Sequence, residues 1–125
     1  MNKTVTNYIA ELLCRLAFLE LPSSPIALPS RPPLFDTPDI LIHATTTRAA
    51  KLWPEKSWLD VLDWCNCHSF TVGLVGSSPK LQREAYNAGD LEESLLEKST
   101  LIDLRGRTSL IQLAGVIREV PTRHY

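Results

Sequence analysis

Residues 41–55 read LIHATTTRAAKLWPE, in which a run of apolar residues passes directly into three threonines. The wider segment Asp39–Ala44 is a short apolar run of the kind found in a strand buried on both faces. Pro54 suits the first position of a helix, so a helix is predicted to begin within WPEKSW. The stretch therefore predicts a strand, a hydroxyl-rich loop and a helix.

The same alternation continues toward the C-terminus. A helix with Trp58, Val61, Leu62 and Cys65 on one face leads to a second strand, FTVGLVG, which ends in a GSSP turn. The helical stretch that follows is predicted to break at Gly89, with Asp90 as a cap and Glu93 completing a capping box. TLIDLRG is predicted to be a third strand. A last helix opens on a Thr or Ser cap, and its predicted apolar face is Leu110, Leu113, Ala114 and Ile117.

The element order is β-α-β-α-β-α. It predicts the α/β class, a Rossmann-like three-layer α/β/α arrangement around a short parallel sheet with right-handed crossovers. Ligands of such sheets collect at the carboxyl ends of the strands. We therefore expect residues 45–47, 76–79 and 105–109 to share one rim.

The threonine loop is the first candidate site on this rim. Hydroxyls and loop amides can donate hydrogen bonds to phosphate, and Lys51 can supply a point charge to a diphosphate. The loop lacks the glycines of a P-loop or of a G-x-G-x-x-G turn, and a capped turn beside a solvated lysine is the alternative.

Other polar and aromatic residues near the rim have plain structural interpretations. His43 is expected to be a satisfied core or rim residue, and Trp53 and Trp58 are expected to anchor packing. Arg105 and Arg107 are candidate rim cations or ordinary exposed arginines. The Thr-Ser pair at 108–109 is adequately explained by helix capping.

Composition indicates one soluble globular domain, with 44% hydrophobic and 22% charged residues. The formal net charge of -1 provides no global field for nucleic acid or anionic lipid, so an anion site must be local. Three cysteines without an export signal fit a reducing compartment. Cys65, Cys67 and His68 could begin a metal site, but the chain shows no second short-spaced pair, and partly buried thiols are favoured.

The N-terminal residues are predicted to form an amphipathic helix. Charges at Glu11, Arg15 and Glu20 exclude a signal sequence or a membrane span. Residues 21–39 hold six of the nine prolines, which predicts a linker. The expected division is a helix and Pro-rich linker at 1–38 and an incomplete Rossmann-like domain at 39–125, because three strands leave a sheet edge unpaired. The apolar face of the helix comprises Val5, Tyr8, Ile9, Leu12, Leu13 and Leu16.

Three segments together resemble a known family. HATTTRAAKLWPEKSW, GLVGSSP and LIDLRGRTSLIQLAGVI are similar to the donor domain of the ADP-heptose:lipopolysaccharide heptosyltransferases, glycosyltransferase family 9, and most similar to its heptosyltransferase I branch. The resemblance covers roughly residues 8–120, and its specific part is the His-Ala-Thr-Thr loop with Lys-x-Trp-Pro-Glu. It implies the C-terminal domain of a GT-B enzyme, which binds ADP-heptose, whereas a facing N-terminal domain takes the Kdo-lipid A acceptor.

The resemblance also implies roles for individual residues. Thr45, Thr46 and Lys51 match the positions that hold the donor diphosphate, and one extra loop residue makes Thr47 a competitor for the second role. The nucleoside would contact the second and third rim loops. The candidate residues there are Gly76, Gln82, Gly106, Arg107, Thr108 and Ser109.

The implied reaction is an inverting transfer that needs no metal or cofactor. A carboxylate base, expected in the missing N-terminal domain, deprotonates the acceptor hydroxyl, so no catalytic residue is assigned in this chain. The resemblance implies a partial enzyme of lipopolysaccharide inner-core synthesis, inactive alone, in the cytoplasm or peripheral to the inner face of the inner membrane. Its partners would be a nucleotide-sugar and a complementing polypeptide, with no nucleic acid. The alternatives are an inactive remnant or interaction module that keeps the βαβ scaffold, and an unrelated nucleotide-binding Rossmann protein.

Overall fold

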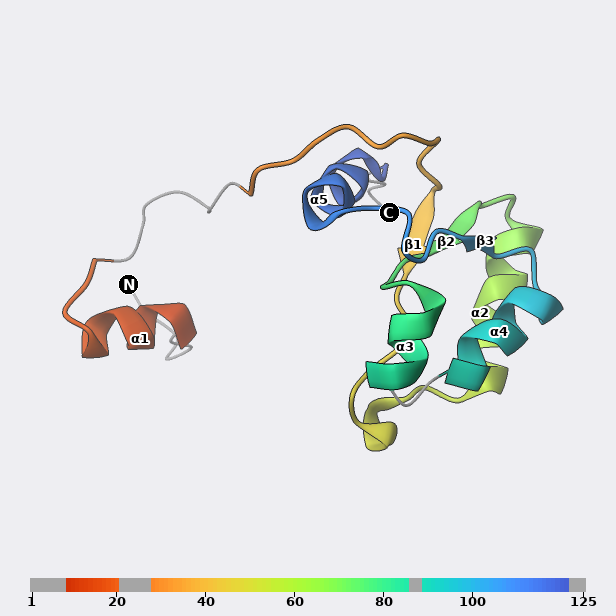
Figure 1. The fold of residues 1–125 in the computed structure, drawn as a ribbon, viewed down its shortest axis with the longest axis horizontal. Helices are drawn as coiled ribbons and strands as arrows, with labels where there is room; N and C mark the ends of the chain where they lie inside the picture. The colour runs from red at the N-terminus through yellow and green to blue at the C-terminus, as the bar shows by residue number, and fades with distance from the viewer. Residues whose placement is uncertain (1–8, 21–27, 86–88, 122–125) are drawn as a thin grey trace, which may run out of the picture.

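The computed structural model describes residues 9–20, 28–85 and 89–121. Within them, three parallel strands form one sheet in the order β1-β2-β3, which confirms the predicted α/β class and the Rossmann-like parallel sheet (Figure 1). The strands are shorter than the apolar runs that predicted them. The elements in chain order are α1 (Ile9–Leu16), β1 (Ile40–Ile42), the 3₁₀ helix η1 (Ala49–Lys51), α2 (Glu55–Cys67), β2 (Val72–Leu74), α3 (Pro79–Ala85), α4 (Gly89–Lys98), β3 (Ile102–Asp103) and α5 (Leu110–Glu119).

The register of the first two strands is fixed at their amino ends. Ile40 lies opposite Val72. One residue earlier, the Asp39 amide donates to Thr71 Oγ1 at 2.9 Å, and the Asp39 carboxylate accepts from both the amide and the hydroxyl of Thr71 at 3.0 Å. A slip of one residue would break all three bonds and would turn each apolar side chain to the other face.

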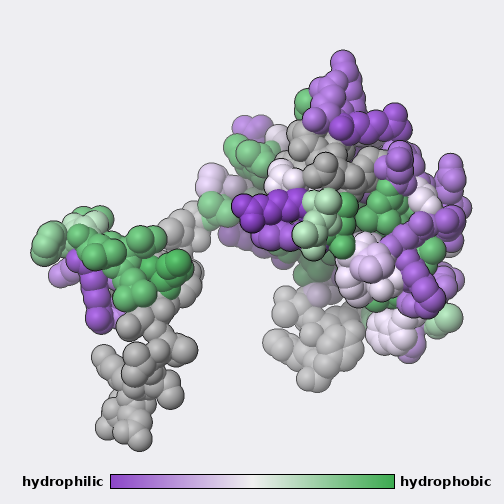
Figure 2. Space-filling view, turned by 90° about the horizontal axis from the view of Figure 1, so that it is seen from below, coloured by the Kyte–Doolittle hydropathy of each residue, from purple (hydrophilic) through white to green (hydrophobic). Residues whose placement is uncertain are grey.

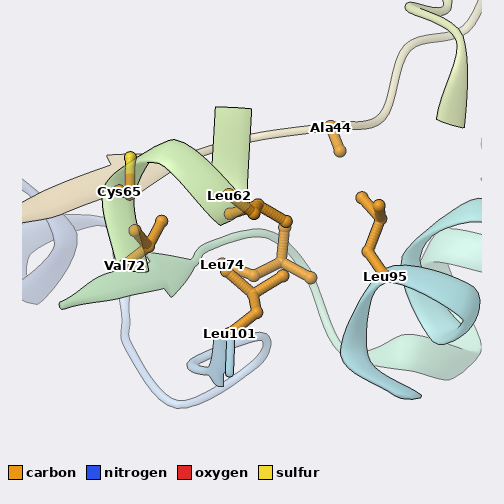
Figure 3. Packing of buried hydrophobic residues seen from close by; sticks show 7 residues of the cluster. All are labelled: Ala44, Leu62, Cys65, Val72, Leu74, Leu95 and Leu101. Carbon is orange, nitrogen blue, oxygen red and sulfur yellow. The ribbon is translucent and has the colours of Figure 1, made fainter. Parts of the chain in front are cut away.

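The main core lies between the sheet and helices α2 and α4. Leu74 and Leu95 are fully buried in it, and α2 supplies Leu62 and Cys65 (Figure 3). Glu55 of α2 also accepts hydrogen bonds from Ser94 and Lys98 of α4. Val61 was predicted on the buried face, but it is exposed, because the contact with the core occupies a narrower stripe of α2.

The opposite face of the sheet is covered by α5 and the extended segment 28–38 (Figure 1). Gly73 faces this side, and a Cβ there would lie 2.8 Å from both Leu104 and Pro38. The segment is bonded to the helix, since the Arg31 amide donates to the Ile111 carbonyl at 3.1 Å. Gly115 sits so close to it that a Cβ would meet the Arg31 carbonyl oxygen at 1.8 Å.

Two helix starts were predicted correctly, but the inward faces of the helices were not. Pro79 opens α3 and Ser109 caps α5, as expected, and Gln112 completes a capping box that was not predicted. The predicted apolar face of α5 was wrong: Gly115 and Val116 are its buried residues, whereas Leu110 and Ile117 are exposed. The backbone of segment 28–38 requires close approach, which favours a glycine face over a leucine face.

The segment between the third and fourth helices also differs from expectation. Helix α4 begins at Gly89, so Asp90 lies in its first turn and does not precede it as a cap. Residues 86–88, where the chain passes from α3 to α4, lie outside the described residues. Glu93 is engaged with arginines, as described below.

Helix α1 stands apart from the sheet (Figure 1). Its amphipathic character is confirmed, while Val5 and Tyr8 of the predicted face lie outside the described residues. In the described part of the chain, no helix is long and apolar enough to cross a membrane. The domain boundary at residue 38 stays a prediction.

Helix propensity and the close contact at Gly115 predict opposite changes in stability for a substitution at this position. Gly115→Ala should raise stability by about 1 kcal/mol if propensity decided the outcome. We expect a loss of about 1–3 kcal/mol instead, because the new methyl group displaces the Arg31 backbone. Urea unfolding followed by circular dichroism measures the change. Lys80→Ala, at an exposed position of α3, should change stability by less than about 0.5 kcal/mol and serves as the control.

Candidate functional site

The loops that follow the three strands leave the same edge of the sheet, because the strands are parallel. The strand ends are joined by backbone hydrogen bonds: Val75 donates to Ile42 at 3.0 Å, and Leu104 donates to Leu74 at 2.9 Å. The segments predicted to share a rim are therefore neighbours in order, with the threonine loop first and residues 105–109 last.

The second and third rim loops touch directly. Gly106 adopts a φ of 68°, a region that glycine enters without strain, and its amide donates to the Gly76 carbonyl at 2.9 Å. A Cβ on Gly106 would lie 2.9 Å from Ser78 Cα. Two of the residues predicted to contact a nucleoside, Gly76 and Gly106, thus hold these loops together through their backbones.

The threonine loop presents its three hydroxyl side chains in different environments. Thr45 is buried, and its hydroxyl lies 3.2 Å from His43 Nε2, so the exposed His43 is a satisfied rim residue as expected. Thr46 is half-buried, and its oxygen accepts from the Arg48 amide at 3.4 Å. Thr47 is exposed. The loop then closes into η1, where the Lys51 amide donates to the Arg48 carbonyl at 2.9 Å.

Lys51 is the cation that the sequence assigned to this loop, and Arg48 is a second exposed cation within it. Lys51 ends η1, its side chain is exposed, and it forms no ion pair with any acidic residue among those described. An ammonium group on a four-carbon stem in that state can move to meet an anion at low cost. The diphosphate assignment of the threonines and Lys51 stays a prediction.

The remaining residues predicted to contact a nucleoside are placed on α3 and at the start of α5. Gln82 lies in α3, but its side chain falls outside what the structure describes. Arg107 is exposed, with its guanidinium carbon 5.2 Å from the centre of the Phe35 ring. Thr108 precedes Ser109, whose hydroxyl accepts from the Gln112 amide at 3.2 Å. Ser109 therefore caps α5, which is the structural role that the sequence analysis gave for this residue.

Arg105 corrects the expectation of a rim cation. Its side chain is only 3% exposed, because carboxylates from β3 and α4 surround it. The guanidinium donates two hydrogen bonds to Asp103 at 2.9 Å, one to the fully buried Glu92 at 3.0 Å and one to Glu93 at 3.1 Å. Arg83 of α3 also reaches Glu93 at 3.7 Å. The residue cross-links the sheet to α4, so it has little capacity left for a ligand.

The electrostatics of this cluster follow from its burial. Burial raises the pKa of the Glu92 carboxyl, and the hydrogen bond from Arg105 offsets only part of that effect. The same guanidinium lowers the pKa of the half-exposed Asp103. The carboxylates in turn raise the pKa of Arg105, so it is charged at every accessible pH.

The sequence did contain a signal for this cluster. Asp103 and Arg105 are two residues apart, which places them on one side of an extended chain. The glutamate pair at 92–93 lies in the predicted helix just before that strand and offers the carboxylates that a buried arginine needs. The partnership was missed because Glu93 was assigned to a cap and Arg105 to the rim.

The tryptophans, the cysteines and His68 that the sequence singled out are each placed by the structure. Trp53 and Trp58 make an edge-to-face contact with ring centres 5.0 Å apart, as expected of packing anchors. Cys65 is buried in the core, Cys67 is exposed, and His68 Nδ1 lies 2.8 Å from the Trp64 carbonyl oxygen. No group of three or more His, Cys, Asp or Glu side chains that could hold a metal occurs among the described residues.

The structure defines a Rossmann-like α/β unit whose hydroxyl loop and lysine follow the carboxyl end of the first strand of a parallel sheet. In comparisons with known protein families, residues 11–122 match Glycosyltransferase family 9 (heptosyltransferase). The chain belongs to this family, which confirms the resemblance seen in the sequence. None of the curated proteins or solved structures compared with the chain matches it significantly.

The buried arginine cluster yields a prediction with a defined pH dependence. Arg105→Met should destabilise the protein by about 3–5 kcal/mol at pH 7, because Glu92 is left charged and buried. Its folded-state pKa then lies well above the unfolded value of about 4.3, so protonation on acidification favours the folded state. The deficit relative to wild type should shrink between pH 7 and pH 5, as measured by urea unfolding.

The control is the same substitution two residues away. Arg107→Met removes the stacking on Phe35 and a weaker attraction to Asp103, leaves Glu92 paired with Arg105, and should cost about 0.5–1 kcal/mol at both pH values. A deficit in Arg105→Met that stays constant with pH would contradict the account, since it would mean that loss of Arg105 does not raise the folded-state pKa of Glu92.

Proposed function

We propose that the threonine loop and Lys51 bind the diphosphate of ADP-heptose, and that the chain is the donor-binding half of an inverting heptosyltransferase of lipopolysaccharide inner-core synthesis. The observation that carries this proposal is the family membership over residues 11–122 combined with a hydroxyl loop and a cation at the carboxyl edge of the sheet.

The chemistry required of this half is charge stabilisation. As the acceptor hydroxyl attacks the anomeric carbon, the bond to the diphosphate breaks and negative charge grows on the departing ADP. Lys51 would meet that charge with an ammonium group, and the hydroxyls of Thr46 and Thr47 would donate hydrogen bonds to the phosphate oxygens. Thr45 is buried against His43, so its role is to shape the loop and to offer its backbone.

The nucleoside would then lie along the second and third loops. The hydrogen bond between the Gly106 amide and the Gly76 carbonyl brings the two loops together, and neither glycine has a side chain to obstruct a base that approaches their backbones. The exposed guanidinium of Arg107 stands beside them and can stack on the base or reach the ribose.

The base and the Kdo-lipid A acceptor site belong, in this proposal, to a facing domain of a GT-B arrangement. Deprotonation of the acceptor requires a carboxylate within hydrogen-bond reach of its hydroxyl. The fully buried Glu92 and the half-exposed Asp103 are both engaged by Arg105 and do not serve as that base. We therefore propose that this chain binds the donor without turnover by itself, at the cytoplasmic side of the inner membrane.

Ligand-dependent thermal stability tests the donor site. A ligand at about a hundred times its dissociation constant adds roughly 2.7 kcal/mol to the folded state, enough to shift the midpoint by several degrees in a chain of this size. ADP-heptose and ADP should both raise the midpoint of the wild type, and Lys51→Ala should abolish the shift. Differential scanning fluorimetry provides the measurement.

Lys56→Ala is the matched control, because Lys56 is exposed on the following helix and paired with Asp60. It should retain the full ligand shift. A cooperative melt that is indifferent to both ligands would overturn the proposal. A shift that survives in Lys51→Ala would remove Lys51 from the site and favour a different nucleotide-binding surface.

A further inference from the structure

The side chain of Arg107 rests on the ring of Phe35. Its guanidinium carbon lies 5.2 Å from the centre of that ring, within the range of a cation–π contact. Asp103 attracts it only weakly, because both oxygens of that carboxylate already accept hydrogen bonds from Arg105. Arg107 is exposed, so while Phe35 covers one side of its planar guanidinium, the other side stays open to solvent.

Phe35 is held in place from both sides along the chain. Before it, the Arg31 amide is bonded to the backbone of α5 at 3.1 Å. After it, Pro38 is buried against β2, since a Cβ on Gly73 would lie 2.8 Å from the proline ring. The Phe35 ring is half-buried, whereas the preceding Leu34 is 84% exposed. The extended segment therefore presents Phe35 to the third rim loop from a fixed backbone.

The backbone of Arg107 is fixed as well. Its amide donates to the Leu104 carbonyl at 3.3 Å and closes a turn, and the Gly106 amide in that turn donates to Gly76 of the second rim loop at 2.9 Å. Arg107 thus stands where the two loops meet, the place proposed for the donor nucleoside. An arginine side chain loses rotamer freedom when a ligand fixes it, so a partner that already holds it lowers the cost of binding.

A nucleobase at this edge is held best by stacking on a planar group. Figure 2 views the molecule from below, the end of the domain at which Figure 1 shows η1, and there the apolar residues of the domain lie in small patches among hydrophilic ones. Individual side chains therefore have to provide the stacking surface. A guanidinium is planar and stacks on aromatic rings, so the open side of Arg107 can take a base while Phe35 supports the other side.

We propose that Phe35 is a positioning residue of the donor site, which holds the guanidinium of Arg107 in the plane on which the base of a nucleoside diphosphate stacks. The order of the stack is Phe35, Arg107 and then the base. The inference rests on the proposed donor function, and it gives the extended segment before β1 a part in nucleotide recognition. Because the stack touches the base alone, it should leave the binding of the diphosphate unchanged.

Binding of ADP and of inorganic pyrophosphate, measured by isothermal titration calorimetry, tests the stack. Pyrophosphate carries the diphosphate without a base. Phe35→Leu should weaken ADP binding about three- to tenfold, the range expected when one side chain with many rotamers has to be immobilised on binding, and should leave pyrophosphate binding unchanged. Phe35→Tyr keeps the ring and should bind ADP as the wild type does. Leu34→Ala, at the exposed neighbouring position, is the control and should bind both ligands as the wild type does.

A second variant tests whether Phe35 acts through Arg107. Arg107→Lys keeps the positive charge but has no plane to stack, so it should weaken ADP binding to the same extent, and Phe35→Leu added to it should have no further effect. Arg107 is exposed, so this variant should fold even if Phe35→Leu does not. Unchanged ADP binding in Arg107→Lys, additive effects of the two substitutions, or equal effects of Phe35→Leu on ADP and pyrophosphate would each overturn the inference.

The same titrations separate this inference from the donor site itself. A wild type that binds neither ADP nor pyrophosphate would overturn both. ADP binding that Lys51→Ala abolishes and Phe35→Leu leaves unchanged would keep the donor site and overturn only the role of Phe35.

Discussion

The buried guanidinium of Arg105 connects the sheet to helix α4. Arg105 leaves the end of β3 and reaches back to the glutamates of α4, so a strand too short to be held by its own ladder is tied to the helix that covers it. The price of burying Glu92 is offset only while Arg105 is present. This tie helps to position the second and third rim loops, because the third loop begins at Arg105 and its Gly106 amide bonds to Gly76 of the second loop.

Local signals in the sequence predicted where helices and strands begin. Contacts between residues far apart in the chain determined the partners of Arg105 and the buried face of α5, which the sequence did not show. Pro79 and Ser109 marked helix starts because a missing amide and a side-chain cap act within one turn. Arg105 was misassigned because its partners lie 12 and 13 residues earlier on another element. The inward face of α5 was misassigned because the backbone of Arg31 approaches the helix at Gly115, where there is no room for a side chain, and this turns Gly115 and Val116 inward.

The candidate site was predicted in place but not in detail. Parallel strands bring their carboxyl ends to one edge whatever the loop sequences are, so the neighbourhood of residues 45–47 and 76–79 followed from element order alone. Which threonine is buried did not follow, because it depends on the side chain of His43 two residues earlier. The sequence pattern predicts where the loop is. The packing of the side chains then decides that Thr45 is buried and Thr47 is exposed.

The bond between the Gly106 amide and the Gly76 carbonyl has a consequence for variation in this family. The two loops share one backbone contact with no side chain between them, so neither can gain or lose a residue without displacing the other. Their lengths are coupled, although 29 residues separate the two glycines in the chain. A change in what this edge recognises is therefore easier to reach by exchanging the side chains at 77, 78, 107 and 108 than by remodelling either loop.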